Sequence, residues 1–137
     1  MASHPGCCNK WLDNLFMSDE AHFTLSGCVN KENYRFWSAE NPHLLHQAPL
    51  HSERLTVWCA ISSHNIIGPY FFQNEEGDTV TVTGDRYRMM LQNFFIPQLQ
   101  LCRIRLRRTW FQQDGAPCHS ANATLALLQQ HFNGRLI

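Results

Sequence analysis

The chain has 137 residues, of which 44% are hydrophobic and 16% charged, and its eleven basic and eleven acidic residues cancel to a formal charge of zero. This length suits one domain with one core, and the composition excludes a disordered protein. A formal net charge of zero does not by itself indicate a nucleic-acid-binding domain, because such domains are often strongly basic. No stretch is apolar enough to predict a membrane span or a secretory signal, and six cysteines without a CxxC pair predict reduced, intracellular thiols.

The first predicted element follows a polar segment, residues 1–11, which we expect to be disordered. Its Cys7-Cys8 pair lacks a matching downstream pair, which argues against a zinc site. Residues 15–25 then alternate like a half-buried strand, and one row of that strand is apolar except for Asp19. An ionised carboxylate among apolar neighbours is costly unless a cation or strong donors meet it. Asp19 therefore marks a candidate site.

The middle of the chain predicts further strands. Residues 29–37 suit an irregular strand, and 38–53 form a loop whose three histidines suggest either metal binding or, as we favour, a solvated surface. Residues 55–62 are nearly continuously apolar, which predicts a central strand buried on both faces. Residues 66–73 and 79–83 predict two more strands joined by an acidic turn, where solvation explains the acids better than metal does. The histidines of the loop are His43, His46 and His51.

The second half predicts two helices around a strand. Helix 85–96 is expected to start at a cap, Thr83 or Asp85, and to end or kink at Pro97. A basic run follows, and either phosphate contacts or plain solvation explains it. Strand 109–113 leads to Asp114 in a Gly-Ala-Pro loop, helix 120–132 ends near Gly134, and residues 135–137 resemble the start of another strand. The apolar residues expected on the face of the last helix are Ala121, Leu125, Leu128 and Phe132, and the basic run holds Arg103, Arg105, Arg107 and Arg108.

The chemistry open to these residues is that of carboxylates. If Asp19 and Asp114 lie on neighbouring strands, they are close enough to share a divalent metal, Mg²⁺ or Mn²⁺, and two such ions can cleave a phosphodiester. The alternative makes Asp114 a turn residue and Asp19 an acid on a poorly registered strand. Cys118 and His119 are adjacent in sequence and therefore poorly placed as nucleophile and base. The sequence also has no nucleophile elbow and no phosphate-cradling glycine loop.

Five blocks of the sequence resemble the catalytic domain of mariner-like transposases, which belong to the acidic-triad transposase and integrase superfamily. They appear in the family's order, and the resemblance as a whole covers roughly residues 12–137. The blocks are MSDEAHFTLSGCVNKENYRFWSAENP, LTVWCAIS, GPYFF, TGDRYRMML and WFQQDGAPCHSA. The resemblance implies an α/β, RNase H-like mixed sheet with flanking helices. It also implies that Asp19 and Asp114 are the first and second catalytic acids and metal ligands. His119 matches the second signature block without an assigned role.

The resemblance further implies metal-dependent cutting and joining of DNA, in DNA transposition and integration, in the nucleus. Its implied partners are transposon ends, target DNA and a second copy of the chain, with no membrane or small-molecule substrate. The family's third acid falls beyond residue 137, so we expect a C-terminally incomplete, truncated domain that is inactive as it stands. The alternatives are a remnant or domesticated module that binds nucleic acid or protein without catalysis, and a zinc-binding module.

Overall fold

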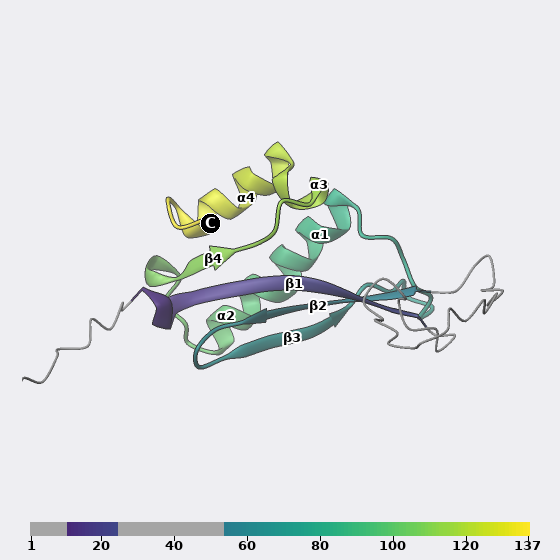
Figure 1. The fold of residues 1–137 in the computed structure, drawn as a ribbon, viewed down its shortest axis with the longest axis horizontal. Helices are drawn as coiled ribbons and strands as arrows, with labels where there is room; N and C mark the ends of the chain where they lie inside the picture. The colour runs from purple at the N-terminus through teal and green to yellow at the C-terminus, as the bar shows by residue number, and fades with distance from the viewer. Residues whose placement is uncertain (1–10, 25–53) are drawn as a thin grey trace, which may run out of the picture.

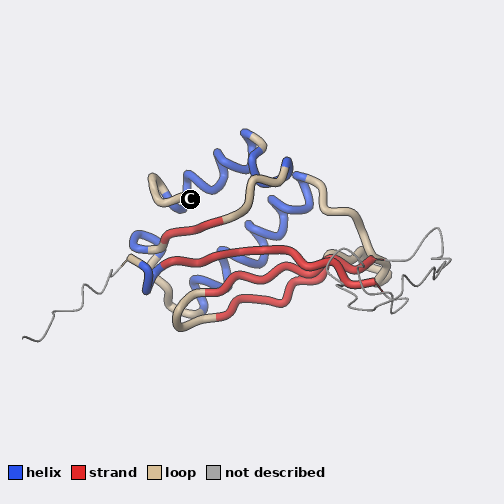
Figure 2. The backbone as a smooth tube through the Cα atoms, viewed as in Figure 1, coloured by secondary structure: helices blue, strands red, loops and turns tan. Residues whose placement is uncertain are grey.

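The computed structural model describes residues 11–24 and 54–137, and within them a mixed four-stranded sheet (Figures 1 and 2). The strands are β1 (Leu15–Thr24), β2 (Arg54–Ile61), β3 (Ile66–Phe71) and β4 (Trp110–Gln112). Their order is β3-β2-β1-β4, with β1 antiparallel to β2 and parallel to β4. This confirms the predicted mixed sheet. The predicted disordered start of the chain, the Cys7-Cys8 pair, the strand over 29–37 and the histidine loop lie outside the described residues, apart from residue 11.

The C-terminal residues extend the sheet beyond β4, as predicted. Phe111 and Leu136 form a parallel bridge, and the Phe111 amide donates to the Arg135 carbonyl at 2.9 Å. Gly134 has a φ of +69°, which turns the chain back after the last helix.

A continuous helical run crosses one face of the strands (Figure 1). It consists of α1 (Gly84–Met90), the π-helical segment η3 (Leu91–Phe95) and α2 (Ile96–Leu101). The Thr83 side chain accepts a hydrogen bond from the Arg86 amide at 3.3 Å, which confirms one of the two predicted caps. The prediction that the helix ends or kinks at Pro97 is wrong in part, because the helical run continues to Leu101. The wider π turn, in which the Ile96 amide bonds to Leu91, makes room for the proline ring.

Two helices follow β4: α3 (Pro117–Ser120) and α4 (Asn122–Phe132). Together they confirm the helix predicted at 120–132, although its buried face differs from the expected one. Leu128 and Phe132 are buried as predicted, whereas Leu125 is exposed and Thr124 takes an interior position. Thr124 is tolerated there because its hydroxyl donates to the Cys118 carbonyl at 2.8 Å.

Aromatic side chains between the helical run and the sheet form the core. Phe95 lies at its centre, with ring centroids 5.1 Å from Trp58, 4.9 Å from Phe111, 6.3 Å from Phe16 and 6.2 Å from Phe132. All five side chains are at most 2% exposed. The core therefore ties β1, β2 and β4 to the helices.

Strand β2 is buried on one face only, so the prediction of burial on both faces is wrong. Thr56, Trp58 and Ala60 point into the core, and the residues between them are only half-buried. The opposite sheet face is apolar but is not covered by the described helices, which pack on the core side. Its exposed residues are Met17, Phe23, Ile61, Ile66 and Phe71.

The acidic turn at residues 74–78 is confirmed, but the strand predicted over 79–83 is not. The Asn74 side-chain oxygen accepts the amides of Glu76 and Asp78, and only Thr79 forms a ladder bridge, to Gln73. Beyond it the Val80 amide still donates to the Phe72 carbonyl, but no strand forms, which shows that β propensity alone does not make a strand.

No helix within residues 11–24 and 54–137 has both the length and the apolar character needed to cross a bilayer. The described cysteines, Cys59, Cys102 and Cys118, have free thiols.

Candidate metal centre

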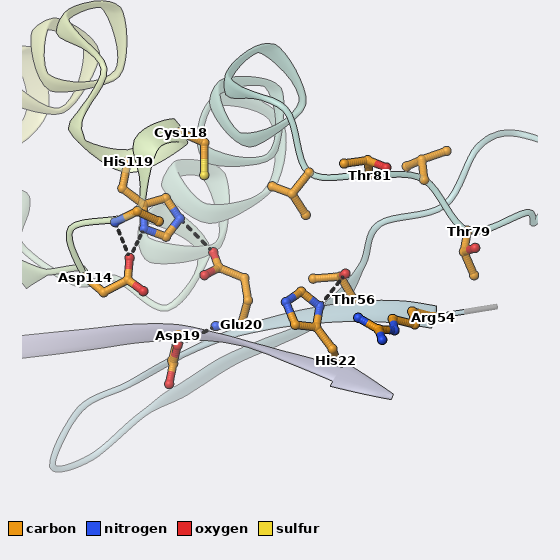
Figure 3. Close-up of a pocket in the computed structure, with 13 residues that line it drawn as sticks. Asp19, Glu20, His22, Arg54, Thr56, Thr79, Thr81, Asp114, Cys118 and His119 are labelled. Atoms are coloured by element: carbon orange, nitrogen blue, oxygen red, sulfur yellow. Dashed lines mark hydrogen bonds and ion pairs between the residues drawn. The ribbon is translucent and has the colours of Figure 1, made fainter. Parts of the chain in front are cut away.

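The parallel pairing of β1 and β4 brings the two signature blocks together. Met17 pairs with Gln112, and the Ser18 hydroxyl donates to the Gln112 carbonyl at 3.2 Å. Because β1 and β4 are parallel, the chain continues from both strands toward the same end of the sheet. Glu20 and Asp114 therefore meet there, as Figure 3 shows.

His119 lies between these two carboxylates. Its Nδ1 is 2.5 Å from Asp114 Oδ1, and its Nε2 is 3.0 Å from Glu20 Oε1. The side chain of His119 is 2% exposed, that of Glu20 12% and that of Asp114 58%. One ligand atom from each of the three residues lies within 4.8 Å of the others. These three residues form the candidate metal centre.

The loop after β4 folds His119 back onto Asp114. Asp114 Oδ1 also accepts the Ala116 amide at 3.0 Å, and Pro117 then starts α3, whose fixed φ suits a first helical turn. Gln113 donates to the His119 carbonyl at 3.0 Å. The short spacing of the DGAPCH sequence therefore places the imidazole within reach of the aspartate.

Tyr87 anchors this loop to α1. Its hydroxyl donates to the Gln113 side chain at 2.9 Å, and its ring centroid is 4.2 Å from that of His119. Burial, followed by the charge of Glu20, raises the pKa of Tyr87, so the phenol stays protonated and remains a donor.

The protonation of His119 and the charges of Glu20 and Asp114 depend on one another. Carboxylate oxygens only accept hydrogen bonds, so His119 donates from both nitrogens as an imidazolium. Burial opposes this charge, but the hydrogen bonds and charges of Glu20 and Asp114 outweigh it and raise the pKa of His119. The Ala116 amide, and then His119, lower the pKa of Asp114, while burial and Glu20 raise the pKa of the Cys118 thiol. In the absence of metal, His119 is the cation that neutralises the two acids.

This arrangement predicts a pH-dependent stabilisation that His119→Gln removes. The pKa of folded His119 is raised above its ordinary 6.5, so its stabilisation is complete below that pH and is lost as the pH rises through the folded pKa. Denaturant unfolding in EDTA should therefore show the wild type more stable than His119→Gln near pH 6. The difference between their free energies of unfolding should become smaller toward alkaline pH. A difference that grows as the pH rises would contradict the assigned charges.

The structure brings Asp114 into the centre but turns Asp19 to the other face of β1. Asp19 is exposed, and its Oδ1 accepts the Glu20 amide at 2.8 Å. The expected inward orientation of the apolar row is wrong, since Met17 and Phe23 are more than half exposed. The even-numbered row faces inward because distant partners satisfy its polar groups. Asp19 nevertheless lines part of the cavity into which the centre opens.

Sequence reasoning missed two members of the centre, Glu20 and His119. Glu20 belongs to the mostly polar row of residues 15–25, and a half-buried strand is expected to turn that row away from the core. In the sequence, His119 stands out only as the neighbour of Cys118 and as a part of the second signature block. The available signal was the five-residue spacing from Asp114 across a proline, which suits a turn that folds back on itself.

The four arginines of the basic run are exposed and lie away from the centre. They precede β4, around the short 3₁₀ turn η4 (Leu106–Arg108), whereas Asp114 follows the strand. Three of them, Arg105, Arg107 and Arg108, border a separate surface hollow together with Ile104 and Leu106. Any phosphate that they bind therefore lies at the opposite end of β4 from the acids.

The centre opens into a cavity of about 670 Å³, the trench, which continues along the second half of β1. The two carboxylates are hard oxygen ligands that fit a divalent metal such as Mn²⁺ or Mg²⁺, and His119, which bonds to both, would orient them. Asp114 uses Oδ1 for the Ala116 amide and His119, which leaves Oδ2 to serve as a ligand. The trench is lined by Asp19, Glu20, His22, Arg54, Thr56, Thr79, Val80, Thr81, Val82, Asp114, Ala116, Cys118 and His119.

A mixed sheet with β1 at its centre, β4 parallel to it, and acids at the shared edge defines an RNase H-like domain. No family model matches the sequence, and neither does any curated protein. Comparison of folds, in contrast, finds solved structures of the Mos1 mariner transposase.

The Mos1 catalytic domain with raltegravir and Mn superposes with a TM-score of 0.60 at 18% identity, over 93% of this chain and 50% of that one. The Mos1 paired-end complex with Mn gives a TM-score of 0.64 at 21% identity, over 91% and 35%. The Mos1 strand transfer complex gives a TM-score of 0.60 at 21% identity, over 88% of this chain and 33% of that one. The chain thus has the fold of the Mos1 catalytic domain and spans a third to a half of the chains that it matches.

Proposed function

We propose that this chain is the RNase H-like core of a mariner-type DNA transposase, a domain that cuts and joins DNA phosphodiesters with divalent metal. The observation that carries the proposal is the Glu20–His119–Asp114 centre at the edge shared by β1 and β4. The fold likeness supports it, since the matched Mos1 structures include complexes with Mg, with Mn and with transposon ends.

The residues present would hold the metal through Asp114 and through the acidic pair Asp19-Glu20 on β1. When bound, Mg²⁺ or Mn²⁺ supplies an activated oxygen nucleophile and stabilises the leaving oxygen. His119 fixes one oxygen of Asp114, as an outer-shell partner orients a ligand. The trench walls position the strand that is to be cut.

The remaining assignments extend the same proposal. The partners are transposon ends and target DNA, joined by a second copy of the chain, and the site of action is the nucleus. Arg103, Arg105, Arg107 and Arg108 contact DNA phosphates beyond the trench, since all four are exposed.

The variants Asp19→Asn and Glu20→Gln test which β1 acid holds the metal. The resemblance favours Asp19, whereas the geometry favours Glu20, which faces His119 and is only 12% exposed. The Mn²⁺ affinity, measured by titration calorimetry, should fall at least tenfold in the variant that removes a ligand, and any nicking of supercoiled plasmid above an EDTA control should fall with it. A Mn²⁺ affinity that is unchanged in both variants would overturn the proposed site.

The second candidate is a nucleic-acid-binding module without catalysis. The specific observation in its favour is that His119 already bonds to both carboxylates, as a metal would. Metal-independent DNA binding by the wild type, with no nicking in Mn²⁺ or Mg²⁺, would select this candidate.

A further inference from the structure

The trench has opposite charges at its two ends. Carboxylates gather at the metal centre, whereas Arg54 and His22 lie toward the other end, as Figure 3 shows. Since a divalent metal held by the carboxylates would attract phosphate groups, as the cationic end does, the trench suits a ligand that carries several phosphates in a row.

His22 and Arg54 come from the paired ends of β1 and β2. His22 lies opposite Thr56 in the register, and its Nδ1 is 2.9 Å from the Thr56 hydroxyl. Thr56 is only 6% exposed, so this bond is partly shielded from solvent and orients the imidazole. Nε2 of His22 has no partner among the described residues.

Arg54 carries a charge that no acidic group among the described residues neutralises. It is exposed, it lines the trench, and no acidic group within the described part of the chain forms an ion pair with it. Guanidinium groups bind phosphate oxygens with two parallel hydrogen bonds. Arg54 therefore has the donors that such a contact needs.

The facing wall of the trench is held in place by its own bonds. Arg86 Nη1 donates to the Thr81 carbonyl at 2.8 Å, and the Val80 amide donates to the Phe72 carbonyl at 3.1 Å. Thr79 and Thr81 border the cavity along this wall. The cationic end thus lies in a walled groove.

We propose that Arg54 and His22 form a phosphate subsite for the nucleic-acid strand that has another phosphodiester, about two nucleotides away, at the metal centre. This inference rests on the proposed function. Glu20 and His22 are two residues apart on one face of β1, about 7 Å along the strand. A DNA strand advances about 3.4 Å per nucleotide along its axis, so about two nucleotides separate the subsite from the metal.

The test is binding of a short fluorescent single-stranded DNA by the full chain, measured by anisotropy in EDTA and in Ca²⁺ over a range of NaCl concentrations. Arg54→Ala should weaken binding by roughly three- to tenfold and reduce the salt slope by about one contact. Arg54→Lys should keep the slope, and His22→Ala should weaken binding more than the matched control His131→Ala. Asp114→Asn should lose the Ca²⁺-dependent gain in affinity, which Arg54→Ala retains.

The possible outcomes distinguish failure of the phosphate subsite from failure of the proposed function. Unchanged affinity and slope in Arg54→Ala, with the Ca²⁺-dependent gain present in the wild type, would overturn the subsite and leave the proposed function standing. A wild-type chain that binds no DNA would overturn both.

Discussion

Replacing Asp114 with asparagine is expected to lower Mn²⁺ affinity at least 100-fold and to abolish metal-dependent nicking. The amide keeps the shape of the side chain and still accepts the Ala116 amide, so the loop should remain folded. What disappears is the charge that a hard divalent cation requires. Even partners outside the first shell of ligands cost about 10- to 100-fold in metal affinity, so a direct ligand should cost more. Titration calorimetry and the EPR signal of free Mn²⁺ measure this loss.

Asp13→Asn is the matched control, because Asp13 is an exposed acid in η1 (Leu12–Asn14), before β1 and outside the trench. It should bind Mn²⁺ like the wild type. Equal affinities for the wild type and Asp114→Asn would show that Asp114 is not a ligand.

Replacing Phe95 with alanine is expected to lower the free energy of unfolding by about 3–5 kcal/mol. Phe95 is fully buried and contacts the rings of Trp58, Phe111 and Phe132. Truncation would leave a cavity where β2, β4 and α4 meet. Because domains are stable by only about 5–15 kcal/mol, much of the folded population would be lost at physiological temperature. Equilibrium unfolding in urea measures the change.

Met89→Ala is the control for Phe95→Ala, since Met89 belongs to the same helical run but is 56% exposed. Its effect should stay within about 0.5 kcal/mol. A loss below about 1 kcal/mol for Phe95→Ala would mean that the aromatic cluster is not the core that this packing describes.

Caps and turns were predicted correctly where the residue types at those positions directly favour the local structure. Thr83 has the side chain of a helix cap, residues 74–78 have turn chemistry, and Gly134 allows a positive φ. The pairing of β1 with β4 has no such local signal. The resemblance and the two acidic blocks predict that these strands are neighbours, but not that they run parallel.

The sequence-based predictions were wrong where contacts between residues distant in sequence outweighed the local sequence pattern. The polar row of β1 faces inward because Gln112, His119 and Thr56 satisfy its groups, and no local pattern shows these partners. The helical run passes Pro97 because a π turn precedes it. Of the three residues of the centre, only Asp114 was predictable, because it directly follows a strand. The role of His119 depends on Glu20, which lies 99 positions away in sequence.

The most direct test of the metal centre is a crystal structure of the chain soaked with Mn²⁺, with data collected at the manganese absorption edge. The account predicts an anomalous peak in the trench, within ligand distance of Asp114 Oδ2 and of a β1 carboxylate. Coordination by Glu20 would support the observed face of β1, and coordination by Asp19 would support the resemblance. A trench without a peak at saturating Mn²⁺, or a peak only at the acidic turn of residues 74–78, would contradict the account.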